Sequence, residues 1–168
     1  MELLLVRHAI AEERDPEKWP DDRGRPLTRE GARKFRSVAR VLSTAWETPD
    51  LVLSSPLARA WQTAQILEEV CSWPAPEEFL SLEPGRRPAE TITALKKRAG
   101  AEHIVLVGHE PSMHEILSFF LGGSADSVSL EVKKGGAALV RFDAAIRAGT
   151  ASLLWLLPPR VLLAVARD

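Results

Sequence analysis

The sequence predicts an α/β fold of three layers, in which a mostly parallel sheet is covered by helices on both faces. Short apolar runs rich in valine and leucine alternate with segments of helical periodicity over much of the chain. Buried parallel strands give continuous apolar runs, and a crossover helix joins each strand to its parallel neighbour. The last two runs follow each other without a helix, across a turn near Gly149, which predicts an antiparallel edge strand.

Five apolar runs have the length of strands in such a sheet. They are ELLLV at residues 2–6, DLVL at 50–53, HIVLVG at 103–108, AALVRF at 137–142 and SLLWLL at 152–157. A further strand is predicted over EEFLSL at residues 77–82.

Two helices are predicted from a capping residue followed by an apolar stripe. Thr28 is the expected N-cap of the first helix, and Ser55 that of the second, with Pro56 at the first helical position. The stripe of the first helix consists of Ala32, Phe35, Val38, Ala39 and Leu42, and that of the second of Ala60, Thr63, Ala64 and Leu67.

Two more helices are expected later in the chain. One runs from Pro88 to about Arg98. The other runs from Pro111 to Leu121, where Gly122 and Gly123 end it.

Length and charge limit the functions that the chain can have. Its 168 residues suit a single domain over residues 1–168. The 22 lysines and arginines nearly balance 23 aspartates and glutamates, so the net charge of -1 excludes the broad basic face of a general nucleic-acid binder. A binding site for an anion must therefore be local.

Neither export nor a membrane span is expected. The first apolar run covers only residues 3–6, too few for the core of a signal peptide. Near the other end, Pro158, Pro159 and Arg160 divide the apolar stretch into pieces far below the about 20 residues of a spanning helix. The single cysteine, Cys71, excludes an intramolecular disulfide. These features predict a cytoplasmic protein.

A long charged loop lies between the first strand and the first helix. It covers residues 9–27 and contains three prolines. Loops of this length in compact domains are usually functional or disordered. We interpret it as a flap near the end of the first strand, and the alternative is a solvated excursion of the surface.

Residues suited to chemistry follow three of the predicted parallel strands. Arg7 and His8 follow the first strand, Arg59 lies in the first turn of the helix after DLVL, and His109 follows HIVLVG. Ligands of an open α/β sheet bind outside the carboxyl ends of its strands. We therefore expect both arginines and both histidines at one edge of the sheet.

Such a cluster suits a phosphoryl group. Guanidinium groups offer planar pairs of donors to its oxygens, and the adjacent helix N-termini add backbone N–H groups. A neutral imidazole carries a lone pair near pH 7 and can attack phosphorus without activation by a metal. The cluster therefore predicts phosphoryl transfer as well as binding.

Four motifs, in their order along the chain, resemble those of the histidine phosphatase superfamily, also called the phosphoglycerate mutase-like family. They are LVRHA at residues 5–9, PLTREG at 26–31, SSPLARAWQTA at 54–64 and VLVGHEP at 105–111. The short chain and the PLT segment most resemble the branch of SixA-type phosphohistidine phosphatases. The resemblance implies a phosphoglycerate mutase-like fold.

The resemblance also implies roles for the clustered residues. His8 would be the nucleophile that takes up the phosphoryl group, while Arg7, Arg59 and His109 would bind its oxygens and stabilise the transition state. Water would then hydrolyse phosphorylated His8, and neither a metal nor another cofactor is implied. Ala9 departs from the usual Arg-His-Gly. It needs a negative φ or a mild strain, so we expect an adjusted site and not a lost one.

A general acid is harder to place. Family members that cleave phosphate esters usually have a carboxylic acid that protonates the leaving alkoxide. Glu83, after EEFLSL, is our first candidate for that acid, ahead of Glu90 and Glu12, and a solvated loop position is its alternative. Imidazole, with a conjugate-acid pKa of about 6.5, leaves with much less help than an alkoxide.

We therefore predict that the substrate is phosphohistidine on a signalling protein, and the resemblance implies a histidine phosphotransfer domain as the partner. A small phosphate ester is the alternative substrate, because specificity lies in loops that the sequence does not explain.

Three other classes of function fit the sequence less well. His109 and His114 are five residues apart with Pro111 between them, whereas the zinc-binding H-E-x-x-H motif places its histidines four apart. Ser54 and Ser55 lack the G-x-S-x-G elbow of a serine hydrolase, and helix capping explains Ser55. A catalytically weak phosphate-binding module would keep the same pocket, but the retention of both histidines and both arginines opposes it.

Overall fold

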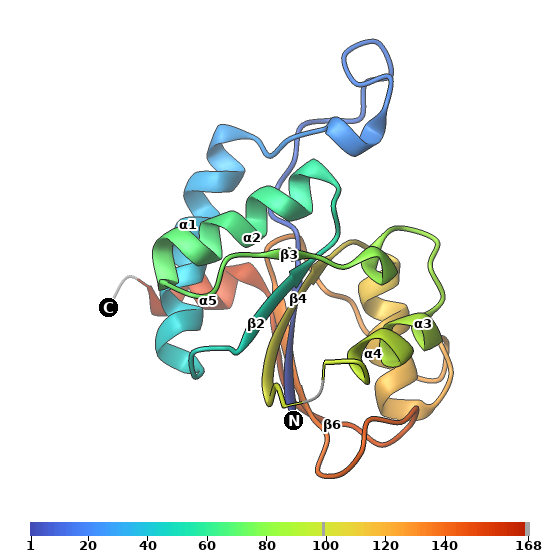
Figure 1. Ribbon diagram of the computed structural model, residues 1–168. Helices are drawn as coiled ribbons and strands as arrows, with labels where there is room; N and C mark the ends of the chain where they lie inside the picture. The colour runs from blue at the N-terminus through green and yellow to red at the C-terminus, as the bar shows by residue number, and fades with distance from the viewer. Residues whose placement is uncertain (99, 167–168) are drawn as a thin grey trace.

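The central element is a six-stranded sheet with the strand order β3-β2-β4-β1-β5-β6 (Figure 1). The computed structural model describes residues 1–98 and 100–166. The parallel strands are β1 (Glu2–Arg7), β2 (Leu51–Ser54), β3 (Glu77–Glu78) and β4 (His103–Gly108). β5 (Ala137–Arg141) is antiparallel both to β1 and to β6 (Ser152–Leu157). The predicted mostly parallel sheet with antiparallel pairing at one side is confirmed.

Helices cover both faces of this sheet (Figure 1). On one face lie α1 (Arg29–Ala45), α2 (Ala58–Cys71) and α5 (Pro159–Val165), and on the other lie α3 (Pro88–Leu95) and α4 (Ser112–Gly122). None of the helices in the described part of the chain is long and apolar enough to cross a membrane.

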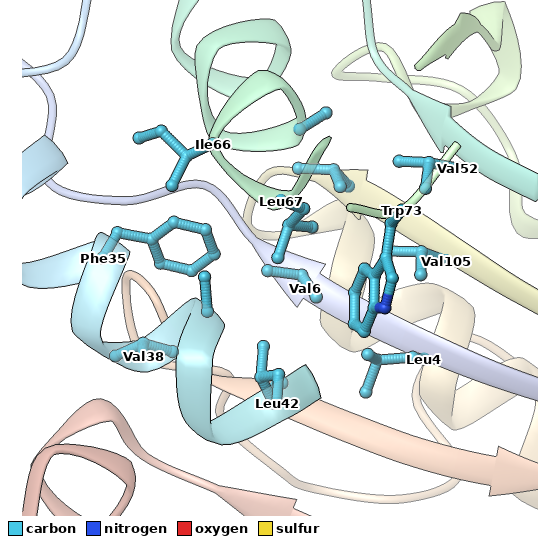
Figure 2. Packing of buried hydrophobic residues seen from close by; sticks show 14 of the residues in the cluster. Leu4, Val6, Phe35, Val38, Leu42, Val52, Ile66, Leu67, Trp73 and Val105 are labelled. Carbon is cyan, nitrogen blue, oxygen red and sulfur yellow. The ribbon is translucent and has the colours of Figure 1, made fainter. Parts of the chain in front are cut away.

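Side chains of the central strand alternate between two apolar cores. Leu4 and Val6 pack toward Phe35 of α1 and Leu67 of α2 (Figure 2). The alternate residues of β1, Leu3 and Leu5, belong to the core under α3 and α4. These four side chains of β1 are fully buried. Burial on both faces is why this strand has a continuous apolar sequence, and it fixes where the residues after the strand emerge.

Thr28 caps α1 as predicted, because its Oγ1 accepts the N–H of Gly31 at 2.8 Å. The predicted start of α2 is wrong. Its N-cap is Leu57 and not Ser55. The backbone N–H of Ser55 donates to the carbonyl of Val107 at 3.0 Å, which extends the sheet pairing by one residue and keeps Ser55 out of the helix.

The strand predicted over EEFLSL is also mostly wrong. Only Glu77–Glu78 pairs with β2, and the chain then forms the 3₁₀ helix η2 (Leu80–Leu82). The N–H of Leu82 donates to the carbonyl of Phe79 at 3.0 Å, and both of these apolar side chains are buried. Their spacing therefore reflects a compact turn and not the alternation of a strand.

The last two predicted helices are present with shifted ends. α3 ends at Leu95, and hydrogen-bonded turns continue from there to Arg98. α4 ends where the paired glycines predict, because Gly123 adopts a left-handed φ of 90° that favours glycine.

The loop over residues 9–27 is held at its base and contains its own short helix. Ala11 and Leu27 form an isolated antiparallel bridge, and η1 (Asp22–Gly24) is a 3₁₀ turn that packs near α2. The loop extends from the same edge of the sheet as the end of β1 (Figure 1). It therefore lies where the sequence predicts a flap.

Candidate active site

The sheet register brings the residues that follow β1, β2 and β4 side by side. Arg7 pairs with Gly108 across β1 and β4, and Ser54 pairs with Val107 across β2 and β4. The next residue of each strand therefore emerges at the same level of one edge. The ring centroids of the two histidines there, His8 and His109, are 5.1 Å apart.

His8 is buried, and one of its ring nitrogens is already engaged. Its Nδ1 lies 2.6 Å from the carbonyl oxygen of Ala9. Since a carbonyl oxygen can only accept, Nδ1 carries the proton and the lone pair is on Nε2. Burial, with the charges of Arg59 and Arg7 as further causes, lowers the pKa of His8 to about 3. The imidazole is therefore neutral at pH 7.

The backbone after His8 is held by a residue of α2. The N–H of Ala9 donates to Oγ1 of Thr63 at 3.0 Å, and this hydroxyl donates to the carbonyl of Arg59 at 2.7 Å. Ser72 is the only non-glycine residue with positive φ in the described part of the chain, so alanine at position 9 adopts an ordinary backbone. The sequence indicates Thr63 only as a member of an apolar stripe, because nothing in its spacing shows this contact.

His109 is buried against Ser55. Its Nε2 lies 2.9 Å from the hydroxyl oxygen of Ser55, which also accepts a long hydrogen bond of 3.4 Å from the N–H of Leu57. With the Ser55 proton donated to Nε2, the ring proton of His109 lies on Nδ1. Burial, followed by the charge of His8, lowers the pKa of His109 to about 2. Ser55 thus orients a histidine, a contact that its sequence position after a strand does not reveal.

Two arginines border the histidines. Nη1 of Arg59 donates to the backbone carbonyl of Asp22 at 2.9 Å and lies 3.2 Å from its carboxylate. Nη1 of Arg7 donates to the carbonyl of Val132 at 2.8 Å. Burial lowers the pKa of both arginines, but a guanidinium stays charged in proteins. Two fixed positive charges therefore lie beside two neutral imidazoles.

The loop before β5 forms one wall of the site. The N–H of Gly135 donates to the carbonyls of both Arg7 and His8 at 3.1 Å. The N–H of Val132 donates to Glu110 at 3.1 Å, so this loop is anchored to the residue that follows His109. Sequence reasoning missed this loop because the contacts join segments that are far apart in the chain.

Glu83, the first candidate for a general acid, is paired with two arginines. It lies 2.7 Å from Nη1 of Arg23 in the loop over residues 9–27 and 3.3 Å from Nη2 of Arg86. The hydrogen bond from Arg23 is the main cause that lowers the pKa of Glu83. These contacts stabilise the carboxylate, whereas a general acid must carry a proton.

The other candidate residues make contacts outside the cluster of arginines and histidines. Glu90 on α3 contacts Arg86 and Arg87, which precede that helix, and Glu12 is exposed on the loop over residues 9–27. Nδ1 of His114, the residue considered as a metal ligand, lies 2.6 Å from the carbonyl oxygen of Leu130. The described residues contain no group of three or more His, Cys, Asp or Glu side chains that could hold a metal ion.

Asp22 and Arg23 are neighbours in η1, and each forms an ion pair with a residue outside the loop. Asp22 contacts Arg59, and Arg23 contacts Glu83. A hydrogen bond from Arg25 is the main cause that lowers the pKa of Asp22. Two ion pairs therefore hold the loop over residues 9–27 beside the histidines.

Comparisons with known proteins agree with this arrangement. An uncharacterized protein of Picosynechococcus sp. is 35% identical over 160 residues, which cover 94% of this chain and 95% of that protein. The solved structure of the protein histidine phosphatase SixA complexed with tungstate matches with a TM-score of 0.80 at 23% identity, covering 96% of this chain and 99% of that one. The alpha-ribazole phosphatase from Shigella flexneri matches with a TM-score of 0.74 at 17% identity, covering 95% of this chain and 97% of that one.

These two structural matches share the fold of this chain from end to end. Residues 3–79, which contain Arg7, His8 and Arg59, match the model of branch 1 of the histidine phosphatase superfamily. This part of the chain matches the family model, and two arginines and two histidines lie together at the sheet edge, so the chain belongs to the histidine phosphatase superfamily.

Proposed function

We propose that the protein is a metal-independent phosphatase that takes the phosphoryl group of a phosphohistidine onto Nε2 of His8 and then releases it to water. The state of His8 is the observation that carries this proposal. Its Nδ1 is held by the carbonyl of Ala9, and the ring is neutral at pH 7, so the lone pair of Nε2 is available for attack. A histidine with a purely structural role at the end of a strand would need neither an oriented ring nor a free lone pair.

Unpaired donors around His8 support a phosphoryl group as the ligand. Nε of Arg7, Nε of Arg59 and Nδ1 of His109 are buried and have no hydrogen-bond partner among the described residues. A buried polar atom without a partner costs about 1–3 kcal/mol, so three of them in one cluster favour an anion that accepts from several sides. The tungstate bound to SixA is an oxyanion of the same kind.

The phosphoryl group would pass between two imidazoles, and the protons then balance without an acid. The substrate imidazole carries a proton on its other ring nitrogen, as His8 does on Nδ1. The P–N bond to the substrate breaks, the bond from phosphorus to Nε2 of His8 forms, and the substrate leaves as a neutral imidazole. Water then attacks phosphorus, the bond from phosphorus to Nε2 of His8 breaks, both protons of the water leave with the phosphate, and His8 returns to its starting state with its proton on Nδ1.

This balance is the reason to prefer phosphohistidine over a phosphate ester. An ester releases an alkoxide that needs a proton, and general acids contribute about 10² to 10⁴ in rate. The carboxylate of Glu83 is held in its charged form by Arg23 and Arg86. The alpha-ribazole phosphatase has the same fold, so small phosphate esters are the second class of substrate to test.

The test compares phosphate release from a phosphohistidine protein by the wild type and by His8→Ala, with a chelator present and with phosphoserine and sugar-phosphate controls. We expect release by the wild type alone, selective for phosphohistidine, and an acid-labile phosphate on His8 by mass spectrometry. Normal turnover by His8→Ala would remove His8 as the nucleophile. Release from the esters alone would replace the substrate class, and activity that needs added metal would contradict the mechanism.

A further inference from the structure

A mostly apolar cavity with a basic rim lies directly beside His8. Its volume is about 250 Å³, and its walls come from the residues after β1, from α1, from α5 and from the loop before β5. Ala9 and Gly135 line it. The carbonyl oxygen of Ala9 contacts Nδ1 of His8, and the N–H of Gly135 donates to the carbonyl of His8. The cavity therefore adjoins the candidate active site.

The lining of this cavity combines an apolar surface with positive charge. Phe35 and Leu163 contribute apolar walls, and the side chain of Ile10 is 40% exposed although it is large and apolar. The basic residues of the lining are Lys34, Lys134 and Arg160, and no carboxylate lines the cavity among the described residues. Lys34 is already paired with Glu30 at 3.3 Å, which leaves Lys134 and Arg160 for an acidic ligand. An exposed apolar surface with a rim of one charge is typical of a site that binds another molecule.

We propose that this cavity is a docking subsite for a phosphorylated protein, which inserts an apolar side chain there and places acidic residues against Lys134 and Arg160. This inference rests on the proposed function and adds the kind of sequence that surrounds the phosphorylated histidine. Charge complementarity identifies the occupant as acidic, and the apolar walls require a side chain such as leucine. A small phosphate ester bound at His8 has no group to fill the cavity.

The mechanism of selection depends on the separation of the two sites. The phosphate pocket recognises only the phosphoryl group, which every phosphorylated substrate shares. A second contact beside it adds binding energy for substrates that carry the matching side chains, and discrimination is a difference between such affinities. The basic rim also attracts an acidic segment over several ångströms, and salt screens this attraction.

Three phosphohistidine peptides of equal length test the proposal. Their flanks contain leucine and aspartate, leucine and lysine, or only glycine and serine, on both sides of the phosphorylated residue. We expect kcat/KM to be highest for the leucine-aspartate peptide, by about tenfold over the leucine-lysine peptide, and this advantage to shrink as salt is added. Equal kcat/KM values for the three peptides would overturn the docking subsite.

Arg160→Glu and Arg40→Glu form a matched pair of variants. Each variant reverses the charge of one exposed arginine, but only Arg160 lines the cavity. Arg160→Glu should lower the preference for the leucine-aspartate peptide about fivefold, whereas Arg40→Glu should preserve it. An equal loss in both variants would mean that the net charge, and not this cavity, selects the peptide.

Hydrolysis of p-nitrophenyl phosphate separates this inference from the proposed function. This small ester contains no flanking residues, and its nitrophenolate leaving group departs without a general acid, so its turnover should be the same in the wild type and in both variants. Turnover of the ester without turnover of any phosphohistidine peptide would overturn the proposed substrate and the docking subsite together. Turnover of all three peptides at one rate would leave the proposed function standing and overturn the docking subsite alone.

Discussion

Lowering the pH from 7 to 5 should destabilise the protein through its two buried histidines. The pKa values of His8 and His109 in the folded protein are about 3 and about 2, because burial disfavours the charged imidazole. In the unfolded chain a histidine has a pKa of about 6.5. Below that value the unfolded chain binds protons that the folded protein does not, so the free energy of unfolding falls as the pH falls.

The fall in the free energy of unfolding depends on the difference between pH 5 and the histidine pKa in the unfolded chain. That difference is about 1.5 units, and each unit corresponds to about 1.4 kcal/mol, so each histidine should cost about 2 kcal/mol at pH 5. Both histidines together should cost about 4 kcal/mol. The loss continues until the pH reaches the folded pKa, so the change between pH 7 and pH 5 requires only that both imidazoles are still neutral at pH 5.

Urea unfolding of the wild type and of His8→Asn at pH 7 and pH 5 measures this effect. The asparagine amide can still donate to the carbonyl of Ala9, but it does not titrate. Carboxylates contribute similarly to both proteins and cancel in the comparison. The loss of stability in the wild type should exceed that in the variant by about 2 kcal/mol. An equal loss in both proteins would refute a buried neutral His8, and with it the proposed nucleophile.

Three further predictions concern single side chains. Glu83→Gln should keep phosphohistidine turnover within about twofold, because the proposed mechanism needs no acid, and a fall of about 100-fold in phosphate release would contradict this. Thr63→Val leaves the buried N–H of Ala9 unpaired and should lower the free energy of urea unfolding by about 1–3 kcal/mol. Gly31→Ala would drive a methyl group into the carbonyl oxygen of Ile10 and should cost about 1–3 kcal/mol by the same assay. An unchanged urea midpoint in either variant would refute the corresponding contact.

The residues of the candidate site could be predicted where they follow strands. Arg7, His8 and His109 each end or follow an apolar run, and parallel strands carry the residues after them to one edge. The sequence also places Ser55 at a strand end but indicates the wrong partner for it. A serine before a proline has the sequence of a helix cap, whereas here the sheet pairing continues through Ser55 and its hydroxyl contacts His109.

Contacts between distant segments could not be predicted. Asp22 reaches Arg59 across 37 positions, and Val132 accepts from Arg7 across 125. No local periodicity or spacing encodes such pairs, because they depend on where the fold places two loops. The segment EEFLSL shows the same limit at short range, since apolar residues at Phe79 and Leu82 serve a turn as well as a strand.

In the candidate site the positive charge lies on guanidinium groups, and the free lone pair lies on an imidazole. Burial disfavours every charged group, but a guanidinium keeps its proton at any accessible pH, whereas an imidazole loses its proton at neutral pH once it is buried. The same desolvation therefore leaves Arg7 and Arg59 positive and His8 neutral. The positive charges in turn oppose protonation of His8, so the groups that would bind the phosphoryl oxygens also preserve the lone pair that would attack phosphorus. Replacing either arginine should consequently weaken phosphate binding and raise the pKa of His8, and the titration of its ring by NMR would measure the second effect apart from the first.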